Sequence, residues 1–569
     1  MPEQTRATAA WEAFVNAGGR AIVLNLLAFT AGALALTGHD GWALAVASAS
    51  LVGGMMFAGV PRAFAVSGPG WGIRATQPLG AYQLSRSLVA LSLVALAGDT
   101  GSVGAVVVGA AFMGLVILEG LVRKILGVWV PRSWNASWST SRPGPSFSPA
   151  WVSVANTLGL VAGAFLVALA PSPWWGLVPA ALAFVPSVLQ VRDALQERTA
   201  KRRFSATLTR ELTAYAPRFV LYWEAEPETG YQIGMWLPYL ERLGEPFVVI
   251  LRHHRNLADV ARFTSAPVVV CPAMNDLDDV VVPSLTTAFY VNNSIRNAHF
   301  VRYPHLRHVQ LNHGDSDKAP SFNPVMRMYD VNFVAGQAAV ERFAANKIAV
   351  RDDFFEIVGR PQVADVQGPR EHDGPATVLY APTWAGFMAD SNYSSLPHGP
   401  EIVAALLAAG CTVVFRPHPH TQKSPQLAAA RDRIYAMLEA DAAATGRQHV
   451  LRERAERELS LVECFNMSDA LVSDVSSVVP DFLYSGKPFA LVAVRATLEQ
   501  FAADNPISTA AYVIDEKMTN LEEQVRLMLG DDPLAPERER VREHYLGSFP
   551  GREYEQVFID AARAQLQPK

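Results

Sequence analysis

The stretch ALVSDVSSVVPDFLYSGKP, Ala470 to Pro488, begins as an apolar run and ends in a polar loop. Two other apolar runs in this half of the chain also end in polar segments, HVQLNHGDSDK at 308–318 and TVVFRPHPH at 412–420. Each run predicts a buried strand, so each polar segment falls at the carboxyl end of a strand, where open α/β sheets bind ligands. Because these segments suit an anionic, phosphate-bearing substrate, the chain is an enzyme candidate.

Short apolar runs alternate with amphipathic helical patterns from about residue 204 onward. The candidate strands are 218–223, 246–252, 267–271, 288–293, 308–312, 331–336, 355–359, 377–384, 412–417, 470–474 and 488–492. This alternation predicts parallel sheets. A Pro- and Gly-rich break at about 361–375 predicts two doubly wound domains, 204–370 and 375–569, which face each other across a cleft. The chain contains no GxGxxG and no GxxxxGK[ST] motif, so neither a dinucleotide site nor a P-loop is indicated.

The first 200 residues have a different composition from the rest. Hydrophobic residues make up 50% of the chain and charged residues 18%, which is little charge for a soluble protein, and the apolar excess lies before about residue 190. A bilayer crossing needs about 20 apolar residues. About six stretches approach that length: 20–37, 42–60, 80–98, 102–122, 151–171 and 174–191. We therefore predict an α-helical, multi-span membrane domain over residues 1–200.

The loops between the predicted spans alternate in charge. Those around Asp40, Thr100 and Ser172 contain no Lys or Arg. Basic residues occupy the other loops and follow the last span: Arg62, Arg74, Arg123, Lys124, Arg132, Arg142, Arg192, Arg198, Lys201, Arg202 and Arg203. Positive loops stay in the cytoplasm. The α/β part is therefore predicted to be cytoplasmic, on a multi-pass protein of the plasma membrane.

Polar residues within the predicted spans are few. No span carries a convincing charge pair, so we expect an anchor rather than a transport path through Asp40 or Glu119. The formal net charge of −5 gives no support to nucleic-acid binding. Three distant cysteines in apolar surroundings predict buried thiols rather than a disulfide framework or a zinc site. The sequence shows no evident cofactor motif and no metal-ligand cluster.

The segment from Ser473 to Ser477 joins a predicted strand to a predicted helix that begins near Ser476. Backbone N–H groups at a helix start bind anions, and two serine hydroxyls can add donors for a phosphate. Asp474 would repel that phosphate, so we expect it to cap the helix or to orient a neighbour. The alternative interpretation is an ordinary helix cap.

The other two motifs carry basic and proton-transferring side chains. The planar fork of Arg416 suits phosphate, and the prolines on either side of His418 fix its backbone. His313 suits proton transfer near neutral pH, and Gly314 lets the backbone approach a ligand closely. Each motif alone could be structural, but the three together indicate an active site.

Together these motifs resemble the CDP-glycerol glycerophosphotransferases, the teichoic-acid primases and polymerases of bacterial cell walls. The resemblance runs from about residue 288 to 488 through FYVNN, the His-Gly motif, YAPTW, RPHP and SDVSSVVPDFLYSGKP. It implies a glycosyltransferase-B-like fold with two Rossmann-like domains, the first on the acceptor side and the second binding the CDP donor. It also implies transfer of an alditol phosphate, glycerol phosphate in the first instance, from a CDP-alditol, with release of CMP. The acceptor would be a hydroxyl of a lipid-linked cell-wall glycopolymer precursor.

The resemblance also implies roles for particular residues. His313 would be the general base, and Arg416 and His418 would stabilise charge on the diphosphate. The implied substrate-binding residues are Gly314, Lys318, Thr383, Ser473, Asp474, Ser476, Ser477, Asp481 and Lys487.

The chain departs from the family pattern in two ways. Asp315-Ser316-Asp317 stands where the family has Thr-Pro-Leu, and two carboxylates beside His313 could raise its pKa or change the acceptor. The multi-span anchor is the second departure. Two other functions stay open: a sugar transferase of the same fold that uses a nucleotide sugar, and a non-catalytic membrane scaffold or exporter component.

Overall fold

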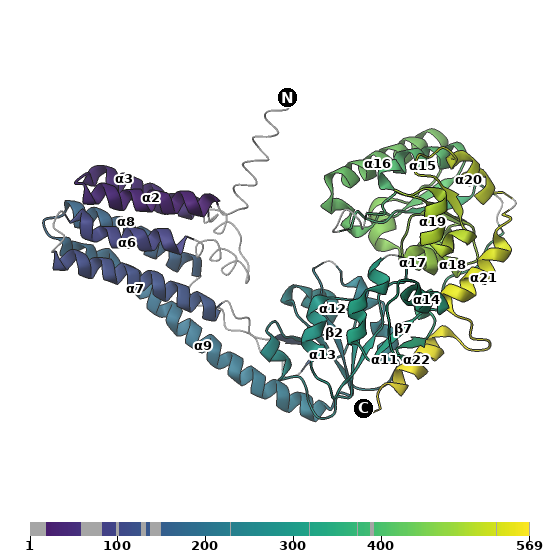
Figure 1. Ribbon diagram of the computed structural model, residues 1–569, viewed down its shortest axis with the longest axis horizontal. Coiled ribbons are helices and arrows are strands. Elements are labelled where there is room, and N and C mark those ends of the chain that lie inside the picture. Colours follow the sequence, from purple (N-terminus) through teal and green to yellow (C-terminus); the bar gives the residue numbers. More distant parts are fainter. Residues whose placement is uncertain are drawn as a thin grey trace. The chain divides into compact units, whose positions relative to one another are not determined.

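The computed structural model describes residues 19–57, 82–97, 102–126, 132–136, 149–227, 229–317, 319–371, 374–386, 392–530 and 532–567. The chain divides into two compact units. The first comprises Met1–Arg132 and Trp138–Leu208, and the second comprises Ser133–Ser137 and Thr209–Lys569. The first unit is helical and the second contains two β-sheets (Figure 1).

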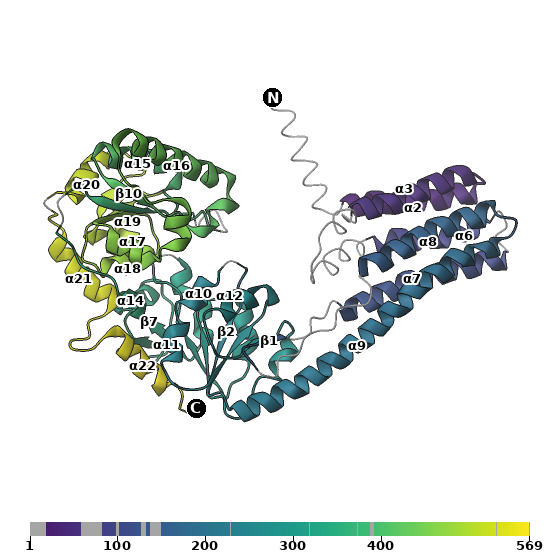
Figure 2. The same cartoon turned by 180° about the vertical axis from the view of Figure 1, so that it is seen from behind.

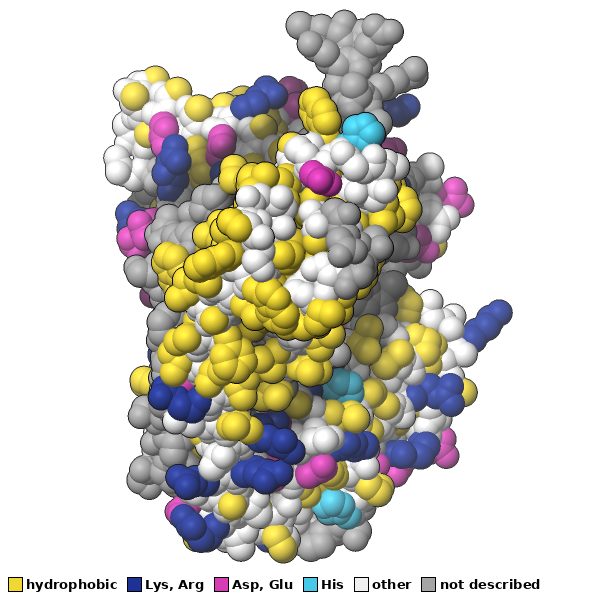
Figure 3. Space-filling model, turned by 90° about the vertical axis from the view of Figure 1, so that its left-hand side faces the viewer, with side chains coloured by type: hydrophobic (Ala, Val, Ile, Leu, Met, Phe, Trp, Pro, Cys, Tyr) yellow, Lys and Arg dark blue, Asp and Glu magenta, His cyan; other side chains and the backbone are white. Residues whose placement is uncertain are grey.

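The helical unit has a helix at each predicted span. These are α2 (Gly19–Leu36), α3 (Asp40–Phe57), α6 (Gln83–Leu96), α7 (Val103–Leu126), α8 (Pro149–Leu169) and α9 (Leu177–Tyr215), the last of which continues into the second unit. Hydrophobic side chains cover much of the face of this unit that Figure 3 presents. Exposed apolar side chains include Leu36, Trp42 and Leu182, which are 70–72% exposed. An apolar outer surface of this kind suits a lipid environment better than water.

The prediction of six spans is wrong for the described residues. Four helical segments there are long and apolar enough to cross a membrane: Gly19–Leu36, Val103–Val122, Trp151–Leu169 and a segment within Pro173–Tyr215. Helix α6 has only 14 residues, and its first turns include Ser85 and Arg86. Helix α3 begins at Asp40 and is not among the four. The four apolar helices indicate association with a membrane.

A buried ion pair links two helices of this unit, contrary to the expectation that no such pair exists. Arg86 on α6 donates from Nη1 and Nη2 to the Glu119 carboxylate on α7, at 2.8 and 2.9 Å. Each side chain is 4% exposed. Ser153 and Asn156 on α8 also donate to Glu119, at 2.5 and 3.1 Å. Sequence spacing cannot reveal this pair because its partners lie on different helices.

The first sheet of the α/β unit has eight strands in the order β1-β4-β3-β2-β5-β6-β7-β8. Their bounds are β1 (Arg132–Trp134), β2 (Phe219–Trp223), β3 (Phe247–Leu251), β4 (Val268–Val270), β5 (Thr287–Tyr290), β6 (Arg307–Gln310), β7 (Val331–Val334) and β8 (Phe355–Ile357). From β4 to β8 all neighbours are parallel. The associated helices are α10 (Tyr231–Gly234), α11 (Leu237–Glu241), α12 (Leu257–Ala261), α13 (Ala298–Val301) and α14 (Gln337–Ala345).

The second sheet has five parallel strands in the order β10-β9-β11-β12-β13. They are β9 (Thr377–Ala381), β10 (Thr412–Phe415), β11 (Ala470–Ser473), β12 (Phe489–Val492) and β13 (Tyr512–Ile514). Helices α15 (Gly399–Ala408), α16 (Pro425–Thr445) and α20 (Leu521–Met528) cover one face. Helices α17 (Leu461–Met467), α18 (Val478–Leu483), α19 (Leu498–Asp504) and α21 (Ala535–Leu546) cover the other (Figures 1 and 2).

The α/β prediction is confirmed, and every predicted strand is present. Continuous runs of Val, Leu, Phe and Tyr made them visible because strands covered on both faces are apolar at every position. Strands β1 and β13 were not predicted, and each has only three residues. The last helix, α22 (Tyr554–Ala564), packs Val557, Phe558 and Ala562 into the core of the first sheet. The end of the chain therefore returns to the first sheet, whereas α21 packs on the second.

Each sheet contains one point where the chain reverses its direction of strand addition. In the first sheet it lies between β2 and β5, and in the second between β9 and β11. Loops leaving the two strands at such a point diverge to opposite sides, which opens a crevice at their carboxyl ends. These two points are the expected ligand-binding positions of the fold.

The buried pair in the helical unit gives a first prediction. Glu119→Leu leaves the Arg86 charge buried without its counter-ion, which should lower the free energy of unfolding by about 3–5 kcal/mol. Arg86→Met together with Glu119→Leu should restore most of that loss. Denaturant unfolding of the detergent-purified full chain measures both variants. A double variant as unstable as Glu119→Leu alone would contradict this account.

Candidate active site

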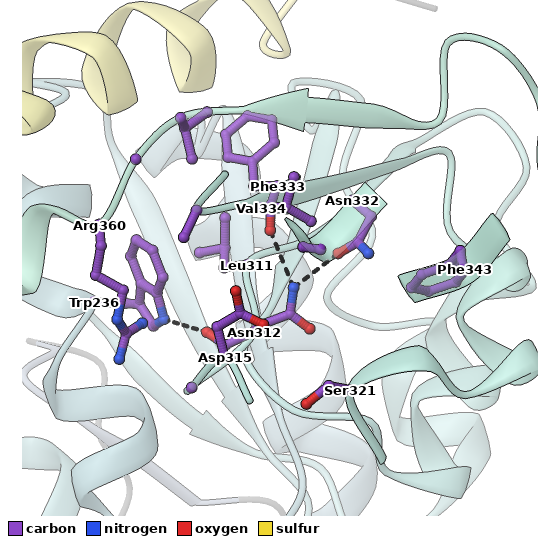
Figure 4. A pocket seen from close by; sticks show the side chains of 15 residues that line it. Trp236, Leu311, Asn312, Asp315, Ser321, Asn332, Phe333, Val334, Phe343 and Arg360 are labelled. Carbon is purple, nitrogen blue, oxygen red and sulfur yellow. Dashed lines mark hydrogen bonds between the residues drawn. The ribbon is translucent and has the colours of Figure 1, made fainter. Parts of the chain in front are cut away.

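The loop after β6 places His313 by means of a fixed turn. Asn312 has a φ of +59°, in the left-handed region, where Asn is among the better tolerated residues. Its side-chain Nδ2 donates to Asn332 Oδ1 at 2.8 Å and to the Phe333 carbonyl at 3.0 Å. Trp236 Nε1 donates to the Asn312 carbonyl at 2.5 Å (Figure 4). These bonds fix the direction in which the chain leaves the strand and therefore the position of His313.

A backbone hydrogen bond sets the tautomer of His313. Its Nδ1 lies 3.0 Å from the Val291 carbonyl at the end of β5, and since a carbonyl can only accept, Nδ1 carries the proton. In the neutral ring Nε2 is then the acceptor, as a general base requires. Burial lowers the pKa of His313 and the charge of Arg360 lowers it further, although the bond to Val291 opposes them. The ring is therefore held neutral and ready to accept a proton.

The two added carboxylates act elsewhere than on His313, so the suggestion that they raise its pKa is wrong. Arg342 on α14 donates from Nη2 to Asp315 and from Nη1 to Asp317, the latter at 2.7 Å. Tyr545 on α21 also donates to Asp317, at 2.8 Å. Burial raises the pKa of Asp315, while Arg342 opposes that shift. Asp-Ser-Asp thus ties the loop after β6 to α14 and α21.

Gly314 brings the loops of the two sheets into contact. A Cβ added at Gly314 would lie 2.8 Å from Ser477 Cβ and 2.9 Å from its Oγ, closer than real Cβ contacts allow. No other residue type could occupy this position with the loops where they are. His313 and the serine segment are therefore adjacent in space, as the sequence motifs predicted.

Two members of the serine motif are buried and form hydrogen bonds with the segment that follows β9. Ser473 Oγ donates to the Ala381 carbonyl at 2.7 Å. The Asp474 carboxylate accepts from the Thr383 N–H at 3.0 and 3.1 Å, and from the Ser395 N–H and Oγ at 2.8 and 3.0 Å. Ser473, Asp474 and Thr383 are therefore supports of the site, with side chains 0–4% exposed. Ser476 and Ser477 are the partly exposed members.

Arg416 and His418 follow β10 but have different surroundings. Arg416 Nη1 donates to the carbonyls of Ala455 and Leu459, the latter at 2.7 Å, so this end of the guanidinium holds a neighbouring loop. His418 Nδ1 accepts from the His420 N–H at 3.0 Å, which leaves the proton of the neutral ring on Nε2. The His418 ring stacks on Trp384 of the YAPTW motif, with centroids 5.9 Å apart. Nε2 of His418 is therefore a hydrogen-bond donor, whereas Nε2 of His313 is an acceptor.

The last two motif residues make buried contacts. Asp481 accepts from Arg360 Nε at 2.6 Å and from Nη2 at 3.0 Å, a bidentate pair between the first sheet's last loop and α18. Lys487 Nζ donates to the carbonyls of Phe465 and Ser468, at 3.0 and 2.8 Å, and is 1% exposed. Burial lowers the pKa of Lys487 to about 8. Lys487 therefore closes the end of α17, and Asp481 joins the two halves of the unit.

Lys318 lies outside the described residues. Sequence reasoning missed Arg360, which follows β8 in a Gly359-Arg360-Pro361 segment. The order strand, Arg, Pro repeats that of Arg416-Pro417 and is the signal that could have found it. Arg360, Gly314 and Asp315 line a cavity of about 30 Å³ (Figure 4). Among the described residues, no group of three His, Cys, Asp or Glu side chains could hold a metal ion.

The family relationship rests on the second half of the α/β unit. Residues 367–500 match the family described as CDP-Glycerol:Poly(glycerophosphate) glycerophosphotransferase. Over these residues the chain is similar to that family. The match contains YAPTW, RPHP and the serine motif, and it confirms the resemblance and an enzyme of the CDP-glycerol glycerophosphotransferase-like kind. The loop of His313 precedes the matched residues. Comparison with curated protein sequences gives no match.

Solved structures match this chain at low sequence identity and with TM-scores below 0.5. The wall teichoic acid polymerase TagF is 12% identical, with 67% of this chain and 97% of that chain covered and a TM-score of 0.39. A UDP-N-acetylglucosamine 2-epimerase is 11% identical, with 61% and 95% covered and a TM-score of 0.40. A glycosyltransferase from Rickettsia africae ESF-5 is 10% identical, with 62% and 99% covered and a TM-score of 0.40.

The contact at Gly314 gives a second prediction. Gly314→Ala should push the His313 and Ser477 loops apart and lower turnover about 10²-fold, because shifts near 1 Å have that effect on reacting groups. Ser477→Gly should restore part of the loss in the Gly314→Ala background, since it removes the clashing atoms. Steady-state CMP release measures both. A double variant no faster than Gly314→Ala would show that the contact is not the cause.

Lys487 and Ser476 belong to one motif but should respond differently to substitution. Lys487→Met removes the Nζ donor from the buried Ser468 carbonyl and leaves the Phe465 carbonyl with only the Ser468 N–H. It should destabilise the fold by about 1–3 kcal/mol, with the KM for donor unchanged. Ser476→Ala should leave the free energy of unfolding within about 0.5 kcal/mol of wild type and raise the KM for donor. Denaturant unfolding and initial-rate kinetics measure the two quantities. A raised donor KM in folded Lys487→Met would reveal a substrate contact.

Proposed function

We propose that this protein transfers glycerol phosphate, or a related alditol phosphate, from a CDP-activated donor to a hydroxyl of a lipid-linked cell-wall glycopolymer precursor, with release of CMP. The observation that carries the proposal is the state of His313. Its ring is neutral and its proton is fixed on Nδ1, and the next residue, Gly314, packs against Ser477 of the family segment. A transferase that activates an acceptor hydroxyl needs a base in this state.

The reaction is a substitution at phosphorus. Nε2 of His313 takes the proton of the acceptor hydroxyl while its oxygen attacks the phosphorus that carries the alditol. The bond from that phosphorus to the bridging oxygen breaks, and CMP leaves with the electron pair. The proton stays on His313 until solvent removes it. Positioning and electrostatics supply most of the rate in such transfers.

Charge on the phosphate of the departing CMP is stabilised from the second sheet. His418 carries its proton on Nε2 and can donate it in a hydrogen bond to a phosphate oxygen, and the Ser476 and Ser477 hydroxyls add donors. These side chains follow β10 and β11, beside the switch point of the second sheet. Arg416 orders this region through the carbonyls that its Nη1 binds.

The membrane unit supports a lipid-linked acceptor. Four apolar helices are long enough to cross a bilayer, and the basic residues after the last span support a position of the α/β unit on the cytoplasmic side of the plasma membrane. Nucleotide-activated donors are made in that compartment. The membrane then keeps a lipid-borne acceptor and the enzyme on one surface.

The base assignment gives a fourth prediction. His313→Ala should lower acceptor-dependent CMP release from CDP-glycerol by about 10²–10⁴-fold. The exposed His305 provides a control of the same residue type, and His305→Ala should keep wild-type rates. Near-normal turnover of folded His313→Ala would eliminate the base assignment. Turnover only with CDP-ribitol or a nucleotide sugar would show that the donor is not CDP-glycerol. A phosphodiester bond in the product would indicate phosphate transfer, and a glycosidic bond would indicate sugar transfer.

The pH dependence gives a fifth prediction. His313 acts as a base only when deprotonated, so kcat/KM should fall as pH falls through its pKa. Burial holds that pKa below the ordinary value of 6.5. The acid limb of the profile should therefore lie below pH 6.5 and disappear in His313→Ala. An acid limb above that value would require another titrating group.

A further inference from the structure

The switch point of the first sheet carries a set of polar and cationic residues that the proposed reaction does not use. Glu224 follows β2, Arg252 and His253 follow β3, and Ser294 and Arg296 follow β5. Strands β2 and β5 are the neighbours between which the direction of strand addition reverses. A crevice at this position is where an open α/β sheet binds a ligand.

Arg252 is the buried cation of this crevice. Its Nη2 donates to the Pro272 carbonyl at 3.0 Å and lies 3.4 Å from His299 Nδ1, and its Nη1 lies 3.5 Å from the Ala273 carbonyl. Arg252 is 3% exposed, and its Nε has no hydrogen-bond partner. A buried guanidinium held by neutral groups leaves its charge uncompensated.

Glu224 accounts for only part of the surrounding positive charge. Its Oε1 lies 3.3 Å from His253 Nε2 and 3.7 Å from Arg296 Nη1, and Ser294 Oγ donates to its Oε2. One carboxylate is thus shared among several donors. Asp278 pairs with Arg302 at 2.6 Å, and Asp276 accepts from the Ala273 N–H at 2.8 Å.

His299 reports the resulting electrostatic potential. Burial lowers its pKa, and the charges of Arg252, Arg296 and Arg302 lower it further, whereas Glu224 opposes them only in part. A site that resists one more positive charge is one that favours an anion.

Two exposed apolar side chains lie on loops at the same end of the sheet. Ile295, between Ser294 and Arg296, is 89% exposed, and Met274, in the loop after β4, is 44% exposed. Arg302 Nη2 donates to the Met274 carbonyl at 3.2 Å, which ties this apolar edge to the cationic cluster. An anionic group attached to a hydrocarbon chain would match both features, whereas a free phosphate would use only the cations.

We infer that the crevice between β2 and β5 binds the phosphate or diphosphate through which the acceptor is joined to its lipid, with Arg252 and Arg296 on the anion and Ile295 and Met274 against the hydrocarbon. The inference rests on the proposed function for the identity of the acceptor. To the proposed function it adds that a phosphate or diphosphate group of the acceptor binds in this crevice. Binding of that group brings the acceptor hydroxyl to the loop of His313.

A binding measurement tests this site without relying on transfer. The full chain, in nanodiscs of phosphatidylcholine, is titrated by calorimetry with inorganic pyrophosphate and with farnesyl diphosphate, with saturating CMP to occupy the donor side. Wild type should bind both, and farnesyl diphosphate should bind more tightly. Arg296→Ala should weaken both about tenfold, the loss expected for one charge-assisted hydrogen bond. Ile295→Ser should remove the advantage of farnesyl diphosphate and leave pyrophosphate binding unchanged.

Arg262 provides the matched control. It lies in the same half of the α/β unit at the end of α12, its side chain is 66% exposed, and it pairs weakly with Asp259 at 3.7 Å. Arg262→Ala should bind both probes as wild type does. An equal loss in Arg262→Ala and Arg296→Ala would overturn the site, because it would indicate a diffuse charge effect. Equal affinity of wild type for the two probes would overturn the assignment to a lipid-borne anion.

The same preparations separate this inference from the proposed function. Wild type that releases CMP from CDP-glycerol but binds no pyrophosphate would refute the site and leave the transferase intact. Wild type that shows Arg296-dependent binding of both probes but releases no CMP with any acceptor would keep the anion site and refute the transfer reaction.

Discussion

The ion pair between Arg360 and Asp481 joins the two halves of the α/β unit, and the geometry of the candidate site depends on it. Arg360 follows the last strand of the first sheet and Asp481 lies on α18, in the serine motif of the second. Both hydrogen bonds are shielded from water, so they fix direction as well as distance. A pair of apolar residues could match its stability but not its directionality. With this register set, Gly314 can pack directly on Ser477.

The two histidines of the site are prepared for opposite tasks by their backbone partners. A carbonyl accepts the Nδ1 proton of His313, so Nε2 is basic. An N–H donates to Nδ1 of His418, so Nε2 carries the proton. The difference comes from which backbone group each loop presents, and no change of residue type is involved. Preorganisation of this kind requires rigid loops. The Asp474 carboxylate makes the loop after β9 rigid by accepting hydrogen bonds from its backbone N–H groups.

The fold was largely predictable from the sequence, because strands buried on both faces appear as unbroken apolar runs. Loop positions at strand ends were predictable for the same reason. The tasks of single residues were not: Ser473 and Ser476 are three residues apart, yet one bonds a buried carbonyl and the other is partly exposed. Lys487 was predicted to bind substrate, and Asp315 and Asp317 were suggested to raise the pKa of His313, but these side chains bond to Phe465 and Arg342, more than 20 residues away in sequence. The role of each of these side chains depends on its partner in the folded structure. A single sequence does not show which residues become partners.

The distribution of charge between the sheets follows from the chemistry that we propose. A CDP-linked donor and a lipid-linked phosphate are both anions, and bringing two anions into one cleft is opposed by Coulomb repulsion of a few kcal/mol at short range. Hydrogen-bond donors beside the second switch point, the serines and His418, can hold the donor diphosphate, from which CMP will leave. Fixed cations at the first switch point, Arg252 and Arg296, would hold a group that stays bound through the transfer. Placing permanent positive charge on the acceptor side reduces the repulsion without making the departing CMP harder to release.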